Sequence, residues 1–195
     1  MKNKKIGITG GMGAGKSLVC SIIKAMGFPI FNADDVAKEI LNNDAEVILK
    51  VKSIFGNQAY KEKALDTSYI ASIVFNDTSK LELLNKLIHP KVRDNFFDFV
   101  ENKNTTVFYE AAIIFESERA KDFDAVILVK APIDLRINRI IKRDGSKKED
   151  ILKRINKQWT DDQKEKLTPY CINNDEDSPL IHQIEQILSK LCISY

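Results

Sequence analysis

A glycine-rich segment near the N-terminus restricts the possible folds more than any other feature of this sequence. It runs Gly10-Gly11-Met12-Gly13-Ala14-Gly15-Lys16-Ser17 and matches the pattern G-x-x-x-x-G-K-[ST] without a mismatch. A strand-like stretch, residues 5–9, precedes it. Apolar residues at helical spacing follow it, at Leu18, Val19, Ile22, Ile23 and Met26. A strand, a glycine-rich turn and a helix in this order indicate a phosphate-binding loop.

The residue types in this loop suit a nucleotide. Glycines allow backbone torsions that point successive N–H groups at an anion, and the helix that starts near Gly15 adds the positive end of its dipole. We expect Lys16 to bridge the outer phosphates of ATP and the Ser17 hydroxyl to bind Mg²⁺. All eight residues, 10–17, are therefore candidate ATP-binding residues. The alternative is a merely structural glycine-rich turn.

The rest of the chain alternates strand-like and helix-like segments. Further strands are expected near residues 29–33, 105–110, 125–129 and 170–173, and further helices after Pro132 and Pro179. This alternation predicts an α/β fold with a parallel sheet and helices on both faces.

Residues 35–100 have helical periodicity with no obvious strand, which suggests an insertion between two strands. A new helix is expected at Pro90, because the residue before a proline avoids helical angles. Residues 146–149, Ser-Lys-Lys-Glu, have the form of a capping box for another helix.

The charge balance and hydropathy exclude several classes of protein. Lys and Arg total 30 and Asp and Glu total 28, so the net charge is +2 and gives no reason to expect nucleic-acid binding. No apolar run approaches the ~20 residues that cross a bilayer. The apolar stretch after the basic N-terminus is interrupted at once by glycines and Lys16, unlike a signal peptide. We expect a cytoplasmic protein that acts on small molecules, with no nucleic-acid, membrane or evident obligate protein partner.

Among proteins with such a loop, the sequence favours a small-molecule kinase. The guanine-binding motif N-K-x-D, the switch motif D-x-x-G and a transporter-type LSGGQ signature are all missing. A small-molecule kinase instead needs a carboxylate near the acceptor and arginines that hold the transferring phosphoryl group.

Three arginines lie on one predicted helix. Arg136, Arg139 and Arg143 are three and four residues apart and therefore share a helix face. Guanidinium groups bind phosphate oxygens well. We expect this helix and the one after Gly145 to form a lid that excludes water from the site. The alternative is a solvated basic face paired with nearby aspartates.

Candidate acceptor-side residues follow the ends of strands, where ligands of parallel sheets lie. Asp34 follows the second strand and can accept the proton of an attacking hydroxyl. The alternative is that Asp34 is only the N-cap of the next helix. Asp35 competes with Asp34 for the same role. Glu110 ends a later strand and could hold a metal-bound water, or lie in solvent. His89 is a candidate substrate contact, or a helix N-cap or buried imidazole.

Taken together, several segments resemble the dephospho-CoA kinase family. They are residues 8–17, 32–37, 89–93 and 139–144, and Arg154 with Gln158. They span nearly the whole chain in the right order. The resemblance implies a P-loop kinase core with a five-stranded parallel sheet flanked by helices, a helical substrate-binding insertion and a helical lid. It also implies ATP-dependent phosphorylation of the ribose 3′-hydroxyl of dephospho-CoA, the final step of CoA synthesis.

The resemblance also implies roles for single residues. Asp34 matches the catalytic carboxylate, Lys16 and Ser17 match the phosphate and Mg²⁺ groups, and Arg139 matches a catalytic lid arginine. Arg143 is then expected at ATP, and His89 and Arg93 at the substrate. The family commonly has Pro-Leu-Leu-Phe-Glu where residues 112–116 read Ala-Ile-Ile-Phe-Glu, which leaves the rigidity of that turn open.

The implied domains are a nucleotide-binding core (1–34, 101–135 and 167–195), an acceptor domain (35–100) and a lid (136–166). Another small-molecule P-loop kinase, with a nucleoside monophosphate or sugar as acceptor, is the alternative.

Overall fold

The computed structural model describes residues 3–62, 64–75 and 77–194. Residues 1, 2, 63, 76 and 195 belong to the segments assigned above but lie outside the described residues. Contacts divide the chain into two compact units. Unit 1 comprises Met1–Asn32 and Lys103–Tyr195, and unit 2 comprises Ala33–Asn102.

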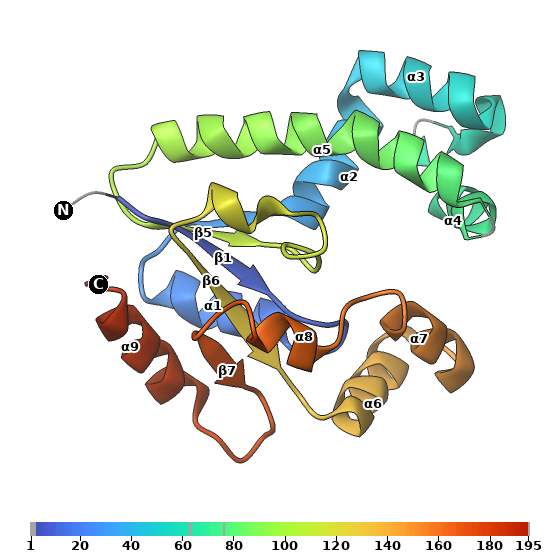
Figure 1. Ribbon diagram of the computed structural model, residues 1–195. Coiled ribbons are helices and arrows are strands. Elements are labelled where there is room, and N and C mark those ends of the chain that lie inside the picture. Colours follow the sequence, from blue (N-terminus) through green and yellow to red (C-terminus); the bar gives the residue numbers. More distant parts are fainter. Residues whose placement is uncertain (1–2, 63, 76, 195) are drawn as a thin grey trace. The chain divides into compact units, whose positions relative to one another are not determined.

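Unit 1 contains a five-stranded sheet in the order β2-β5-β1-β6-β7 (Figure 1). Every neighbouring pair of these strands is parallel. The strands are β1 (Lys5–Thr9), β2 (Ile30–Asn32), β5 (Val107–Glu110), β6 (Ala125–Lys130) and β7 (Cys171–Asn173). The expected α/β fold with a five-stranded parallel sheet is confirmed.

The two faces of the sheet are covered by different parts of unit 1. Ile6 and Ile8 point into a core that includes buried residues of α1 (Lys16–Ala25) and α9 (Leu180–Lys190). A side chain at Gly7 would point to the opposite face, where the side chains of Ile114 and Phe123 lie close to this glycine. The remaining helices of unit 1 are η2 (Arg119–Asp122), α6 (Ile133–Asp144), α7 (Lys148–Ile155) and α8 (Asp161–Glu165).

The strand register places several polar residues at one edge of the sheet. Glu110 is aligned with Asn32 on one side and with Ile8 on the other, and Lys130 is aligned with Asn173. The loop after Thr9 and the segment after Asn173 therefore leave the sheet at the same carboxyl edge, where ligands bind in such folds.

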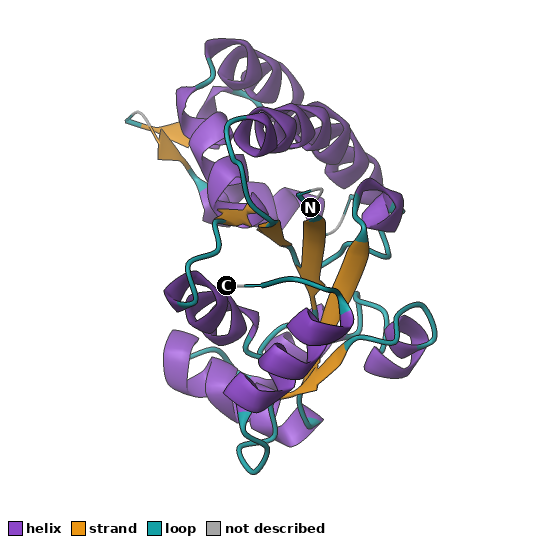
Figure 2. Ribbon diagram, turned by 90° about the vertical axis from the view of Figure 1, so that its left-hand side faces the viewer, coloured by secondary structure: helices purple, strands orange, loops and turns teal. Residues whose placement is uncertain are grey.

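Unit 2 is mostly helical, as expected, but it also contains a small hairpin. Its helices are α2 (Ala33–Asn43), α3 (Ala45–Phe55), η1 (Asn57–Ala59), α4 (Thr67–Val74) and α5 (Thr78–Glu101). The antiparallel strands β3 (Tyr60–Lys61) and β4 (Ala64–Leu65) appear in orange among the purple helices of this unit in Figure 2. The sequence did not reveal them because two-residue strands have no measurable alternation.

The expected helix start at Pro90 is wrong. Pro90 lies inside α5, which continues through it. An interior proline removes a backbone hydrogen bond and costs about 3 kcal/mol. Buried Ile88 and Val92 lie on either side of Pro90, and the Asp77 side chain caps the start of α5 by accepting from the Lys80 N–H. Packing and capping therefore outweigh the local preference.

The expected capping box at residues 146–149 is also wrong. Lys147 occupies the N-cap position of α7, one residue after Ser146, and no side chain caps the helix. A capping box is present before α8, where Thr160 and Gln163 exchange hydrogen bonds. Within the described ranges, no helix combines the length and apolar content needed to cross a bilayer.

Candidate active site

The glycine-rich loop of unit 1 connects the end of β1 at Thr9 to the start of α1 at Lys16. No acidic residue lies in the first turn of α1, so nothing on that turn offsets the positive end of the helix dipole. The Lys16 ammonium group donates to the carbonyl oxygen of Gly10 at 3.0 Å. The lysine side chain is therefore folded back over its own loop.

A pocket of about 190 Å³ opens beside this loop. Its lining residues are Gly13, Gly15, Lys16, Ser17, Arg139, Ile140 and Arg143. The structure thus brings together loop residues and two of the three arginines that the sequence singled out. A helix N-terminus and three cationic side chains around one pocket suit a polyphosphate.

The third arginine has a different position. Arg136 is 6% exposed, and its Nε donates to the Met12 carbonyl oxygen at 2.8 Å. Its Nη1 lies 3.5 Å from a carboxylate oxygen of Asp161. Burial lowers the pKa of Arg136 and raises the pKa of Asp161. Arg136 therefore holds the phosphate loop in place through the Met12 carbonyl group. Helical spacing alone does not reveal this role.

Glu110 is buried at the carboxyl edge of the sheet, so its placement in solvent is excluded. Its two carboxylate oxygens accept from the Ser17 hydroxyl and from the Asn32 side-chain amide, each at 3.2 Å. Burial, and next the neighbouring Glu110 charge, raise the pKa of the Cys20 thiol, which keeps the thiol neutral. A hydroxyl and a carboxylate in contact are the oxygen ligands that Mg²⁺ prefers.

The segment after α7 also contacts the loop. The Gln158 side-chain oxygen accepts from the Met12 N–H at 2.9 Å. Gln158 is one of the residues in which this sequence resembles the kinase family. Its contact with the loop could not be predicted from the sequence.

The turn at residues 112–116 is held by side chains. The fully buried Lys164 pairs with Glu116 at 2.8 Å and lies 3.4 Å from the Ala112 carbonyl oxygen. The Thr9 hydroxyl donates to the same carbonyl oxygen at 3.2 Å. These contacts restrain the turn at Ala112, the position at which the family that this sequence resembles commonly has a proline.

The acceptor-side candidates lie in unit 2. Asp34 is exposed and is the second residue of α2, so it lies inside the first helical turn and not at the N-cap position. Asp35 pairs with Lys38 at 3.0 Å. His89 is half-buried in the middle of α5, so it is no N-cap either. Arg93, one turn later, lies with its guanidinium 5.4 Å from the centre of the Phe97 ring.

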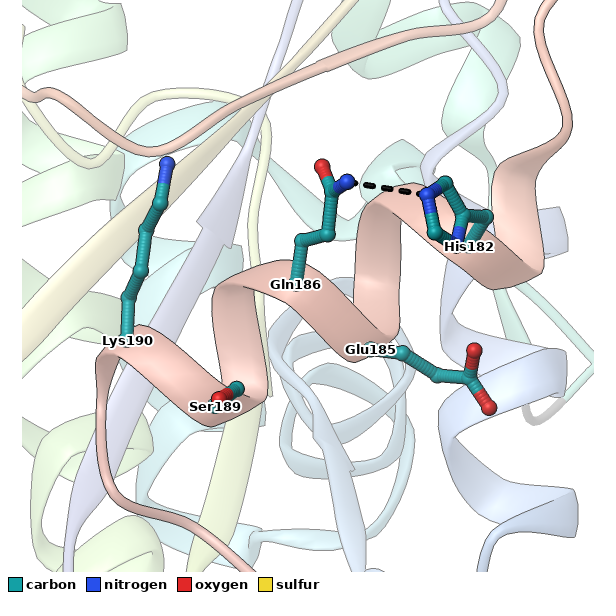
Figure 3. Close-up of a pocket in the computed structure, with 5 residues that line it drawn as sticks. All are labelled: His182, Glu185, Gln186, Ser189 and Lys190. Carbon is teal, nitrogen blue, oxygen red and sulfur yellow. Dashed lines mark hydrogen bonds between the residues drawn. The ribbon is translucent and has the colours of Figure 1, made fainter.

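A second hollow in unit 1, of about 540 Å³, lies along the polar face of α9 (Figure 3). In Figure 3 the side chains of His182, Gln186 and Lys190 project from the same side of the helix, while Glu185 points away. The side-chain nitrogens Nε2 of Gln186 and Nε2 of His182 are 2.9 Å apart. All its lining residues come from one helix, so it lacks groups that converge from different elements on a ligand.

Comparison with known proteins gives one consistent result. The family model described as dephospho-CoA kinase matches residues 4–179. A dephospho-CoA kinase of Chlorobaculum tepidum is 38% identical, covering 95% of this chain and 94% of that protein. One of Bacteroides fragilis is 32% identical, covering 96% and 92%. The solved structure of a dephospho-CoA kinase from Campylobacter jejuni superposes with a TM-score of 0.69 at 26% identity, covering 97% of this chain and 98% of that one.

Proposed function

The chain belongs to the dephospho-CoA kinase family, and we propose that it transfers the γ-phosphoryl group of ATP to the ribose 3′-hydroxyl of dephospho-CoA, giving CoA and ADP. The observation that carries this proposal is the pocket of unit 1, in which the phosphate loop meets Arg139 and Arg143. The family is one of kinases, which accounts for the polyphosphate-binding character of that pocket.

Residues 10–17 hold the ATP phosphates in this proposal. The loop N–H groups and the N-terminus of α1 surround the β- and γ-phosphates, and Lys16 exchanges its contact with the Gly10 carbonyl for phosphate oxygens. Arg139 and Arg143 line the same pocket and meet the charge of the transferring group from the other side.

The residues present also fit Mg²⁺. The hydroxyl of Ser17, an exposed residue beside the loop, donates to the buried Glu110 carboxylate, and both groups supply oxygen ligands. Bound Mg²⁺ neutralises phosphate charge during the transfer. Asn32 orients the Glu110 carboxylate by donating to its second oxygen.

Asp34 is the proposed catalytic carboxylate on the acceptor side. It accepts the proton of the 3′-hydroxyl as the hydroxyl oxygen forms its bond to the γ-phosphorus and the bond to the ADP oxygen breaks. His89 and Arg93 are one helical turn apart on α5, and they are proposed to hold the substrate, whose diphosphate is anionic.

Residues 136–166 are proposed to act as the lid. Most of α6 and all of α7 lie within this range, and the two helices are joined through Gly145. They share a small core of Ile137, Ile140 and Ile151, against which Met12 packs. Closure over the pocket excludes water, which would otherwise accept the phosphoryl group. The other proposed parts are the core (1–34, 101–135 and 167–195) and the acceptor domain (35–100), and the cytoplasmic location remains a prediction.

An ADP-release assay with matched acceptors tests the proposal. The purified protein is given ATP and Mg²⁺ with dephospho-CoA, a nucleoside monophosphate or a sugar, and CoA formation is followed separately by mass spectrometry. We expect ADP and CoA in equal amounts with dephospho-CoA and only background ADP with the others. Turnover that favours a nucleoside monophosphate or a sugar would support another small-molecule kinase instead.

A further inference from the structure

Asn174, the residue after β7, uses every polar group it has. Its N–H donates to the Lys130 carbonyl oxygen at 2.8 Å, which extends the pairing of β7 with β6. Its side-chain Nδ2 donates to the Ala14 carbonyl oxygen of the phosphate loop at 2.9 Å. Asn174 is 5% exposed, so these hydrogen bonds form away from water.

The acceptor groups of Asn174 are used by Arg139. The guanidinium Nη1 donates to the Asn174 carbonyl oxygen at 3.2 Å, and Nη2 donates to the side-chain Oδ1 at 3.4 Å. One buried amide thus contacts both the loop expected to hold ATP and the arginine expected to meet the transferring phosphoryl group.

An amide side chain of this length meets two demands at once. The Ala14 carbonyl needs a donor and the Arg139 guanidinium needs an acceptor, and asparagine presents one of each on a single rigid group. An aspartate would place a second acceptor against the Ala14 carbonyl. An alanine would leave that carbonyl and one guanidinium nitrogen without this partner.

Gly15 is matched to this amide. A Cβ atom added at Gly15 would lie 2.0 Å from the Asn174 Nδ2, and the residue has a φ of +92°. The amide therefore fills the space that the missing side chain leaves beside the start of α1. This close approach fixes the position of Asn174 relative to the loop.

We propose that Asn174 is a positioning residue that sets the placement of Arg139 relative to the phosphate loop. The inference rests on the proposed role of Arg139 in the transfer. Asn174, which is anchored on Ala14, holds two guanidinium nitrogens. A carboxylate oxygen of Glu176 also accepts from Nη2 at 3.3 Å. Of these two partners, only Asn174 links the side chain of Arg139 to the phosphate loop. Preorganisation of this kind lowers the reorganisation needed at the transition state.

A double-mutant cycle of Asn174→Ala and Arg139→Ala tests the proposal. In the otherwise unchanged enzyme, Asn174→Ala should lower kcat by about 10- to 100-fold, the effect of losing one hydrogen bond to a charged group. In the Arg139→Ala background the same change should lower kcat only about threefold or less, because the residue through which it acts is absent. Losses that multiply in full would overturn the inference.

The single variants keep the two proposals distinguishable. If Arg139→Ala alone leaves kcat unchanged, the role of Arg139 itself is wrong. If Arg139→Ala lowers kcat but Asn174→Ala does not, only the positioning role of Asn174 is wrong.

Two further variants separate positioning from stability. Asn174→Asp keeps the acceptor for Arg139 and loses the donor to Ala14, so kcat should fall less than in Asn174→Ala while the KM for ATP rises at least as much. Equal losses of kcat would contradict the Arg139 contact. Gln183→Ala is the matched control, because the Gln183 amide makes two hydrogen bonds to the neighbouring Asn173. It should lower the melting temperature without changing the ratio of kcat values in the cycle.

Discussion

The Arg136 guanidinium occupies the space in which a side chain on Gly11 would have to lie. A Cβ atom added at Gly11 would be 2.1 Å from the Arg136 Nη2. The same guanidinium donates to the carbonyl oxygen of the next residue, Met12. The buried arginine and the second glycine of the loop are therefore parts of one packing arrangement, which the motif pattern alone does not show.

Replacing Arg136 by alanine should destabilise the protein strongly. The change leaves the largely buried Asp161 carboxylate without its guanidinium and the Met12 carbonyl without its donor. Breaking a buried pair in this way costs about 3–5 kcal/mol. Urea unfolding measures the loss. Arg143→Ala, on the same helix but with a side chain 65% exposed, should leave the unfolding midpoint nearly unchanged.

Glu110→Gln should raise the Mg²⁺ concentration that half-maximal activity requires. The amide keeps the shape of the side chain and one acceptor for Ser17 or Asn32 but removes the negative charge offered to the metal. We expect an increase of about 10- to 100-fold, similar to the loss of a supporting group at other metal sites. Activity measured across a Mg²⁺ titration reports this shift, and an unchanged titration curve would exclude Glu110 from the metal site.

Lys16→Ala should remove nearly all turnover, by at least about 10²-fold, without unfolding the protein. The lysine caps a loop carbonyl in this structure and its charge is not needed for packing. Steady-state kinetics and a melting curve are compared with those of Lys24→Ala, an exposed lysine of the same helix. Near-normal turnover of Lys16→Ala would contradict the phosphate-binding role of the loop.

Asp34→Asn should lower kcat by roughly 10²–10⁴-fold if the carboxylate is the base. The proton leaves the hydroxyl late in a loose phosphoryl transition state, so the lower part of this range is the firmer expectation. Dephospho-CoA binding and the melting temperature should change little. Asp35→Asn, at the next residue, is the control. If kcat falls in Asp35→Asn and not in Asp34→Asn, Asp35 is the base. If kcat falls in neither variant, Glu110 is the remaining candidate carboxylate.

The pH dependence of stability should report the buried Cys20 thiol. Its pKa is raised in the folded protein, so its contribution to stability is complete below the pKa of the unfolded thiol, about 8.5, and declines as the pH rises above it. The loss approaches about 1.4 kcal/mol per pH unit. Cys20→Ser does not titrate in this range. The difference in unfolding free energy between wild type and Cys20→Ser should therefore shift by about 1.4 kcal/mol between about pH 7 and about pH 9.5. A constant difference would mean that Cys20 does not titrate on unfolding.

The sequence predicted well those parts of the fold that local pattern determines. The strands of the five-stranded sheet and the helix starts after Gly15, Pro132 and Pro179 appear within a few residues of their expected positions. In each case an apolar period and a turn or cap residue agree. The predictions at Pro90 and Ser146 are wrong. At Pro90, tertiary packing continues α5 through the proline. At Ser146, the N-cap of α7 is the next residue, Lys147.

The candidate site divides in the same way. Helical spacing placed three arginines on one face, and it could not show that Arg136 turns to the loop while Arg139 and Arg143 line the pocket. The partnership of Asn174 with Ala14 joins residues 160 positions apart in the chain. Such contacts depend on strand order, which no local pattern in the sequence encodes.

The strands β2 and β5 are neighbours in the sheet, although the whole of unit 2 lies between them in the chain. The sheet of unit 1 is therefore complete without a strand from that segment. A continuous segment between two paired strands can be lengthened, shortened or exchanged at a closure cost that rises only slowly with its length. The part of the molecule proposed to bind the acceptor is thus one continuous insertion, and a change in its length need not disturb the strand pairing that positions the phosphate loop.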